Sequence, residues 1–213
     1  LGALVMSGAT IKELSLPTER KNNSYFSVKE AVFPFSKFPE VDVLLGPEMK
    51  STGEVMGFGK SFGEAYFKAQ RAAGVILPKT GNVFISVRDH DKEPICEVAA
   101  ELINMGFDIY ATSGTYLHLK ESGVSCTKIN KVKDGHPHIV DMIKNNEVHL
   151  IINTTEGARS IKDSFSIRKE AQNHKISLTT TVSGAKAFCK AIKFIDDFDA
   201  VDLKLRHESL TVN

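Results

Sequence analysis

The sequence predicts a doubly wound α/β domain on a five-stranded parallel sheet, preceded by an incomplete α+β piece. From residue 83 onward, short apolar runs alternate with segments whose apolar residues recur at helical spacing. These runs are nearly continuous, which is typical of parallel strands buried on both faces. Before residue 78, prolines and glycines interrupt the apolar runs, as in edge strands and loops. The alternation of strands and helices therefore sets the fold class.

The N-terminal piece is expected to contain little regular secondary structure. A first helix could end near residues 14–17, and residues 32–35 and 41–45 are apolar but lie among prolines, so edge strands or shaped loops are expected there. Residues 61–73 have helical spacing and stop at Gly74. Residues 74–81 form the candidate linker. The predicted division is residues 1–77, 78–195 and a tail, 196–213, which could be a docked helix or a loose end.

The α/β domain is predicted to hold five strands and the helices between them. Strands are expected at residues 83–87, 106–111, 126–130, 148–155 and 176–181. Helices are expected from residue 93 to Gly106, over 115–122, from Pro137 as the first helical residue, around Ile167 and Ala171, and over 187–195. Right-handed crossovers would place the helices on both faces of the sheet.

Polar residues follow every predicted strand. In an open parallel sheet, ligands collect at the carboxyl ends of the strands. Those ends carry Arg88, Lys92, Thr112, Ser113, Gly114, Thr115, Asn130, Lys131, Asn153, Thr154, Thr155, Thr180 and Thr181. The turn at residues 112–115 opens a helix, whose free N–H groups suit a phosphate. Hydroxyls, amides and cations without a strong general base indicate anion binding rather than catalysis. The alternative is that each residue only caps a helix or faces solvent.

Two other groups have a structural and a functional interpretation. His136 and His138 flank Pro137, a spacing that favours a helix start over a zinc site. Asp89 and Asp91 could act as paired carboxylates, but acids before a helix are usually caps. Asp163 could bind a ribose hydroxyl or, as the favoured interpretation, cap its own helix through Ser164. No metal ligands are therefore assigned.

Composition excludes several classes of protein. Lys and Arg number 27 against 26 Asp and Glu, a net charge of +1, so no global field favours nucleic acid or an anionic membrane. Three separated cysteines without a C-x-x-C pair indicate a reducing compartment, and we expect the cytoplasm. No apolar run reaches the roughly 18 residues of a spanning helix. Neither a P-loop, a dinucleotide fingerprint nor a magnesium-type carboxylate set is present, so no cofactor is expected. The chain also starts directly in a folded pattern, as if cut from a longer one.

Two long motifs carry a resemblance to a known family. The segments SVKEAVFPFSKFP (residues 27–39) and LGPEMKSTGEVMG (45–57) resemble the end of the second ATP-grasp unit in the large chain of carbamoyl-phosphate synthase. FISVRDHDK (84–92), ATSGT (111–115), NKV (130–132), PHIVD (137–141) and IINTT (151–155) resemble its regulatory domain, which has the methylglyoxal-synthase-like fold. The resemblance runs from about residue 1 to 193.

The resemblance implies a regulatory region that is not catalytic alone. The parent is an ATP- and glutamine-dependent ligase that uses Mg or Mn, has a glutaminase small subunit, forms oligomers, and serves pyrimidine and arginine biosynthesis. UMP or IMP would bind as effector. The implied phosphate contacts are Lys92, Thr112, Gly114, Thr115, Lys131, Asn153 and Thr155, with Ser86, Asp163 and Thr181 nearby.

Ornithine and two other functions need separate treatment. The family's ornithine pattern maps onto Glu30 and Thr180, but Thr179 stands where bacterial members have an aspartate, so the ornithine ammonium would lose a charged partner. A methylglyoxal-synthase-type lyase is the alternative function. Its Gly-Thr-Thr-Gly turn appears here as residues 113–116, and its Gly-Gly-Asp loop has no match. A purely structural oligomerisation domain would leave the polar strand ends unexplained.

Overall fold

The predicted five-stranded parallel sheet is confirmed. The computed structural model describes residues 1–15, 25–35, 44–45, 48–200, 202 and 204. The strands are β3 (Gly81–Ser86), β4 (Phe107–Thr112), β5 (Thr127–Ile129), β6 (Leu150–Asn153) and β7 (Ser177–Thr179). All pair in parallel in the order β5-β4-β3-β6-β7. The first strand of the domain therefore lies at the centre of the sheet.

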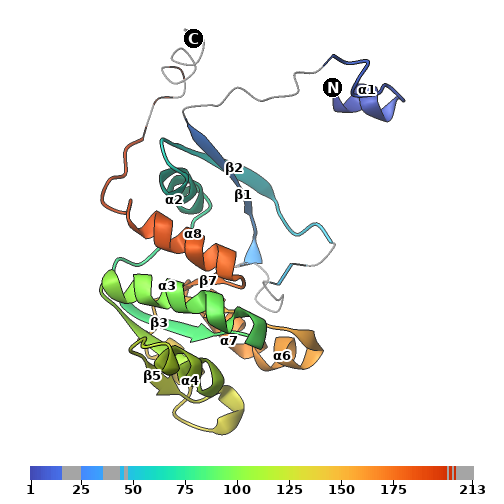
Figure 1. The fold of residues 1–213 in the computed structure, drawn as a ribbon. Helices are drawn as coiled ribbons and strands as arrows, with labels where there is room; N and C mark the ends of the chain where they lie inside the picture. The colour runs from blue at the N-terminus through green and yellow to red at the C-terminus, as the bar shows by residue number, and fades with distance from the viewer. Residues whose placement is uncertain (16–24, 36–43, 46–47, 201, 203, 205–213) are drawn as a thin grey trace.

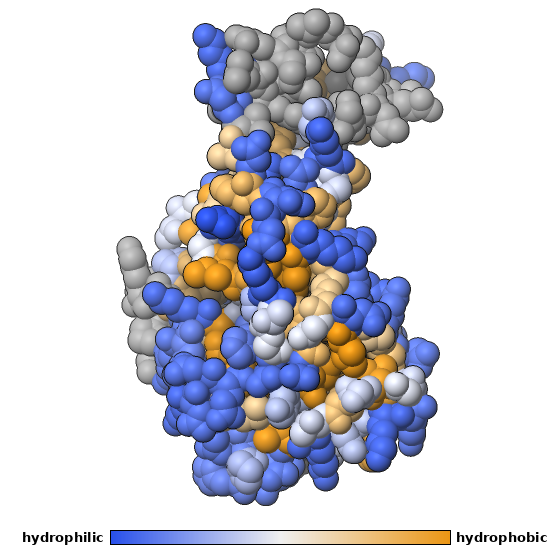
Figure 2. All heavy atoms as spheres, turned by 90° about the vertical axis from the view of Figure 1, so that its left-hand side faces the viewer, coloured by the Kyte–Doolittle hydropathy of each residue, from blue (hydrophilic) through white to orange (hydrophobic). Residues whose placement is uncertain are grey.

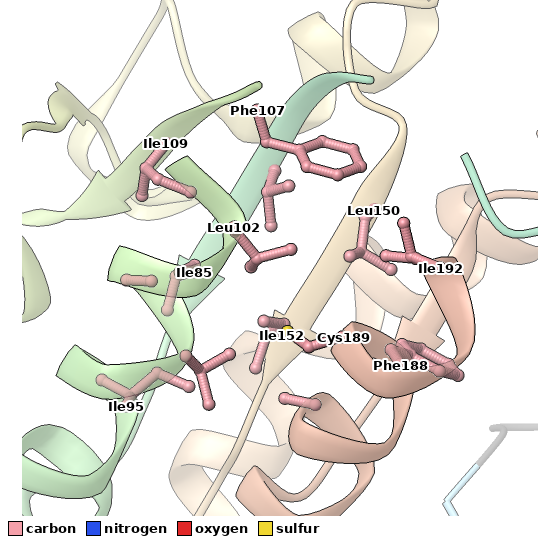
Figure 3. Close-up of a cluster of buried hydrophobic side chains, with 14 of the residues drawn as sticks. Ile85, Ile95, Leu102, Phe107, Ile109, Leu150, Ile152, Phe188, Cys189 and Ile192 are labelled. Carbon is pink, nitrogen blue, oxygen red and sulfur yellow. The ribbon is translucent and has the colours of Figure 1, made fainter. Parts of the chain in front are cut away.

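Helices cover both faces of this sheet. One face packs against α3 (Lys92–Asn104), α4 (Ser113–Glu121) and α8 (Val182–Ile192), and the other against α5 (Ile139–Lys144) and α7 (Phe165–Asn173), which follows α6 (Gly157–Asp163). Neighbouring residues of β3 show the alternation, since Ile85 faces Ile95 and Leu102 while Phe84 belongs to the opposite cluster (Figure 3). The domain is doubly wound, as expected.

The strand order creates a switch point between β3 and β6. Chain leaving β3 enters α3 on one face, and chain leaving β6 leads to α7 on the other. Ser86, the last residue of β3, pairs in register with Asn153, the last residue of β6. In open sheets of this kind, ligands bind where neighbouring connections diverge. The fold thus brings the ends of β3 and β6 to one expected binding edge.

A two-stranded antiparallel sheet precedes the domain, at positions that the sequence did not indicate. It consists of β1 (Phe26–Val32) and β2 (Gly53–Gly59). Residues 32–35, where an edge strand or a shaped loop was expected, contain the end of β1 at Val32 followed by loop, and residues 41–43 of the other expected segment lie outside the described part of the chain. Glycines made residues 53–59 look like a loop.

Two glycines of β2, Gly57 and Gly59, have a packing reason. They lie under α2 (Phe62–Ala72), the helix expected at residues 61–73. A Cβ on Gly57 would lie 2.1 Å from the backbone oxygen of Ala65, and one on Gly59 would lie 2.6 Å from the Ala65 nitrogen. Glycine in a strand commonly marks such a close approach of backbones. The helix can contact the strand backbone directly because these side chains are absent.

The segments that connect the two parts are packed. Leu77, within the expected linker, is buried in the main core, and Tyr66 of α2 contacts Phe188 of α8 with ring centroids 6.2 Å apart. The described start of the tail also docks, since Phe198 lies edge-on to Phe67 at 6.1 Å. The domain division at residue 78 stays a prediction.

The N-terminal helix differs from its expectation, and the surface is mainly polar. Helix α1 (Gly2–Met6) ends well before residue 14, has no buried residue and lies apart from both sheets (Figure 1). On the face shown in Figure 2, hydrophilic residues cover most of the surface and hydrophobic residues emerge between them in smaller patches. Within the described residues, no helix has both the length and the apolarity to cross a membrane.

Candidate functional site

At the ends of β3, β4 and β6, four polar residues are joined by hydrogen bonds and a fifth, Thr115, binds the backbone just after β3. The five are here called the strand-end cluster: Ser86, Thr112, Thr115, Asn153 and Thr154. The hydroxyls of Ser86 and Thr112 lie 3.0 Å apart, and the Val87 N–H donates to the Thr115 hydroxyl at 3.2 Å. The Asn153 amide and the Thr154 N–H both donate to the Ser86 carbonyl, at 3.3 and 3.1 Å. Four of the five were predicted site residues, and the sheet brings them together.

One acceptor in this cluster has no hydrogen-bond partner within the described residues. Asn153 is 1% exposed, and its Oδ1 is buried and unpaired. A buried polar atom without a partner typically costs about 1–3 kcal/mol. A donor supplied by a ligand would remove this cost.

The N-terminus of α4 is free to receive an anion. Thr112 occupies the N-cap position, but its side chain makes no capping hydrogen bond, because its hydroxyl faces Ser86. The first N–H groups of the helix therefore receive no acceptor from the N-cap side chain, and the dipole is positive at this end. Gly114 in the first turn is exposed. The helix was expected to begin at Thr115 but begins at Ser113. Residues 112–115 therefore form the N-cap and first turn of α4.

Lys92 lies beside this helix start. The Lys92 ammonium is 3.4 Å from the position that a Cβ on Gly114 would take. Lys92 also forms an ion pair with Asp89 at 2.7 Å. The hydrogen bond from Lys92, its charge and the more distant charge of Lys131 lower the pKa of Asp89. Both predicted lysines thus lower the pKa of the same carboxylate, that of Asp89.

A buried carboxylate supports the loop after β3. The Arg88 Nε donates to Asp91 Oδ2 at 2.8 Å, and the Arg88 N–H donates to the Thr154 hydroxyl at 3.1 Å. Burial acts to raise the pKa of Asp91, but hydrogen bonds from Thr154 and Arg88 outweigh it, and the pKa is lowered. The expectation that Asp91 caps the helix is wrong, because its side chain makes no capping bond and binds Arg88 instead.

Sequence reasoning placed Thr154 and Arg88 among the polar strand ends but not among the residues expected to contact the nucleotide. The available signal was their position directly after predicted strands, beside Asn153 and Ser86. Thr155, which was assigned, is half-buried next to Thr154. Successive residues at a strand end point in alternate directions, so one of Thr154 and Thr155 enters the cluster. Only the tertiary structure shows that it is Thr154.

Two other expected residues have structural partners. Thr181 caps α8, since its hydroxyl accepts from the Gly184 N–H at 3.0 Å. Asp163 is the last residue of α6 and lies 3.5 Å from the Lys133 ammonium, so the interpretation of Asp163 as a cap through Ser164 is wrong. Ser164 caps neither neighbouring helix with its side chain.

The proposed ornithine residues occupy different elements. Glu30 lies in β1, where burial raises its pKa and a hydrogen bond from Gln70 opposes the shift. Burial, together with the Glu30 charge, raises the pKa of nearby Tyr66 to about 12. Thr180 follows β7 and is half-buried, and the hydroxyl of Thr179 donates to the Thr181 carbonyl at 3.3 Å.

The histidine pair begins a helix, as expected, but with a different first residue. His138 is the N-cap of α5, and its ring and the Asp141 carboxylate form a reciprocal capping box. Pro137 therefore precedes the N-cap, and Ile139 is the first helical residue in place of Pro137. The side chain of His138 provides the acceptor that the helix start requires.

Comparisons with known proteins agree with this geometry. Residues 94–180 match the model of the MGS-like domain. The carbamoyl phosphate synthase large chain of Pseudomonas syringae pv. tomato is 57% identical over 194 residues, 91% of this chain and 18% of that protein. That of Xylella fastidiosa (strain Temecula1) is 47% identical over 212 residues, 100% of this chain and 20% of that protein.

A relative that is only a C-terminal section shows which part of the large chain this chain resembles. The carbamoyl phosphate synthase large chain, C-terminal section, of Aquifex aeolicus is 54% identical over 180 residues, covering 84% of this chain and 33% of that protein. The chain thus spans a third or less of the length of these curated relatives. It belongs to the carbamoyl phosphate synthase large chain family and corresponds to the C-terminal region, which carries the MGS-like domain.

Proposed function

We propose that the strand-end cluster, together with Lys92, Lys131 and the start of α4, binds a nucleotide monophosphate that regulates the parent synthase. The observation that carries the proposal is the Lys92 ammonium beside Gly114, at a helix N-terminus without a side-chain cap. A phosphate there would accept from backbone N–H groups and from the lysine together. Thr115 and Thr112 would supply further hydroxyl donors.

The unpaired acceptor favours a ligand larger than phosphate. A phosphate dianion offers only acceptors, so it cannot satisfy Asn153 Oδ1. A ribose hydroxyl or a base N–H can. The same cluster therefore suits a phosphate joined to a group with donors, as in UMP or IMP. Thr155, Ser86, Asp163 and Thr181 would be secondary contacts.

The lyase alternative fits the site less well. Proton abstraction at neutral pH is most efficient when the base has a pKa near 7. The buried carboxylate at this edge, Asp91, has a lowered pKa and is held by Arg88 and Thr154. Asp89 likewise has a lowered pKa because it pairs with Lys92. Both carboxylates are arranged to stay ionised, which supports binding over catalysis.

In the parent protein, the effector site would bias carbamoyl phosphate synthesis. The proposed parent is an ATP-dependent ligase that requires Mg or Mn and glutamine, with a glutaminase small subunit and an oligomeric assembly, and it serves the pyrimidine and arginine pathways. This region would be silent alone and act on the remainder of the large chain. Coupling of this kind is typically about 1–3 kcal/mol. Glu30 and Thr180 would bind ornithine only weakly, because Thr179 supplies no charge.

Calorimetric titration of the chain with UMP, IMP and their nucleosides tests the proposal. The nucleotides should bind and the nucleosides should bind much more weakly. A charge-assisted hydrogen bond contributes about 1.5–3 kcal/mol, so Lys92→Ala should weaken nucleotide binding roughly 10- to 100-fold. Lys131→Ala should weaken it as well, while Lys144→Ala, an exposed lysine on α5, should leave it unchanged. No heat with either nucleotide at millimolar concentration would contradict the proposal.

A further inference from the structure

Three possible metal ligands converge where the loop after β5 meets the start of α5. His136, His138 and Asp141 each offer one ligand atom, and these atoms lie within 4.8 Å of one another. His136 Nδ1 is 2.7 Å from Asp141 Oδ2, and His138 Nδ1 is 3.1 Å from the same oxygen. Within the described part of the chain, this is the one group of three or more His, Cys, Asp or Glu residues with that geometry.

The hydrogen bonds of the helix start leave two acceptors facing each other. The Asp141 N–H donates to His138 Nδ1 at 3.4 Å, so this nitrogen presents a lone pair. The Asp141 carboxylate oxygen also presents only lone pairs when ionised. With the ring in this tautomer, His138 Nδ1 and Asp141 Oδ2, which are 3.1 Å apart, both offer lone pairs to a cation. His136 Nδ1 lies 2.7 Å from the same carboxylate oxygen.

From this convergence we propose that His136, His138 and Asp141 bind a divalent transition metal, zinc in the first instance. Two imidazoles and one carboxylate are ligands typical of zinc, with water in the fourth position. Neighbouring ligand atoms in a tetrahedral zinc site are about 3.4 Å apart, close to the separations present here. Magnesium and calcium prefer oxygen ligands alone, and the imidazoles disfavour them.

The backbone can keep the helix start while the metal is bound. The Asp141 N–H also donates to the His138 carbonyl at 3.0 Å, so it retains a partner if the ring nitrogen binds zinc. His138 is 7% exposed and is further placed by a bridge to Asn130 at the end of β5. Two ligands are therefore fixed by the fold. His136, whose side chain is 77% exposed, completes the site from the solvent side.

Zinc titration of the metal-free chain tests this site. Competition with a colorimetric zinc indicator should show one equivalent bound per chain at micromolar zinc, and cobalt substitution should give the visible absorption of a tetrahedral ion. His136→Ala should weaken zinc binding by at least about tenfold. His90→Ala is the matched control, because its side chain is 84% exposed and lies outside the triad.

The variants distinguish a defined zinc site from nonspecific binding of zinc at the protein surface. Because His136 is exposed, its alanine variant should keep the far-ultraviolet circular dichroism of the parent. Asp141→Asn should weaken zinc binding too, and its fold is checked in the same way. Equal zinc affinity of the His136→Ala and His90→Ala variants, or no binding at micromolar zinc, would overturn the proposal.

Discussion

Replacing Gly114 by alanine should raise stability and weaken nucleotide binding at once. Gly114 is the second residue of α4, and its φ lies outside the left-handed region. An added Cβ would lie 3.4 Å from Lys92 Nζ and 3.9 Å from Lys92 Cε, which is ordinary contact. The fold can therefore accept the methyl group without displacement of backbone.

The stability change follows from the unfolded state and the helix. Alanine in place of a compatible helical glycine stabilises by about 0.5–1 kcal/mol. For a chain of this size, that free energy corresponds to a rise of roughly 1–4 °C in Tm. Scanning calorimetry without ligand measures it. A fall in Tm would show that the helix start differs from the one described.

The binding change follows from the space the methyl takes. The Cβ would stand beside the lysine ammonium, where the phosphate is proposed to lie, and should weaken nucleotide affinity by tenfold or more, about 1.4 kcal/mol. Titration with UMP and inorganic phosphate should show the loss for both, whereas residual nucleoside binding should change little. A raised Tm with unchanged phosphate affinity would refute this placement of the phosphate.

Three further variants probe charge, pH and packing. Asp89→Asn should tighten UMP binding in calorimetry, because it removes a carboxylate that competes for the lysine; weaker binding would contradict this. Asp91→Asn should cost about 1–3 kcal/mol in urea unfolding at neutral pH. Because the folded pKa of Asp91 is lowered, its stabilisation is present above the unfolded pKa of about 3.9 and disappears as the pH falls through the lower folded value, so the difference between variant and parent should shrink as the pH is lowered below about 3.9. Gly57→Ala should destabilise by about 3 kcal/mol or more, since its Cβ would lie 2.1 Å from the Ala65 oxygen; equal urea midpoints would argue against that helix contact.

Local pattern was sufficient for the strands of the α/β domain and for its α-helices other than α6, which was not expected. Buried strands such as Leu150–Asn153 are continuous apolar runs, and α3 shows its inner face in residues at helical spacing. The pattern failed in β2, where glycines that permit a close helix contact look like loop residues. It also failed at Asp91, because acids near a helix start are common caps while this one pairs with Arg88.

The sequence by itself determined the alternation of strands and helices and the polar character of every strand end. Those properties depend on residues close in the chain, whose burial and hydrogen bonding follow from local periodicity. Only the tertiary structure decided that β3 lies between β4 and β6, and so that Ser86, Thr112 and Asn153 meet. Strand order and register are set by packing between residues far apart in sequence, and no local pattern specifies which strand ends become neighbours.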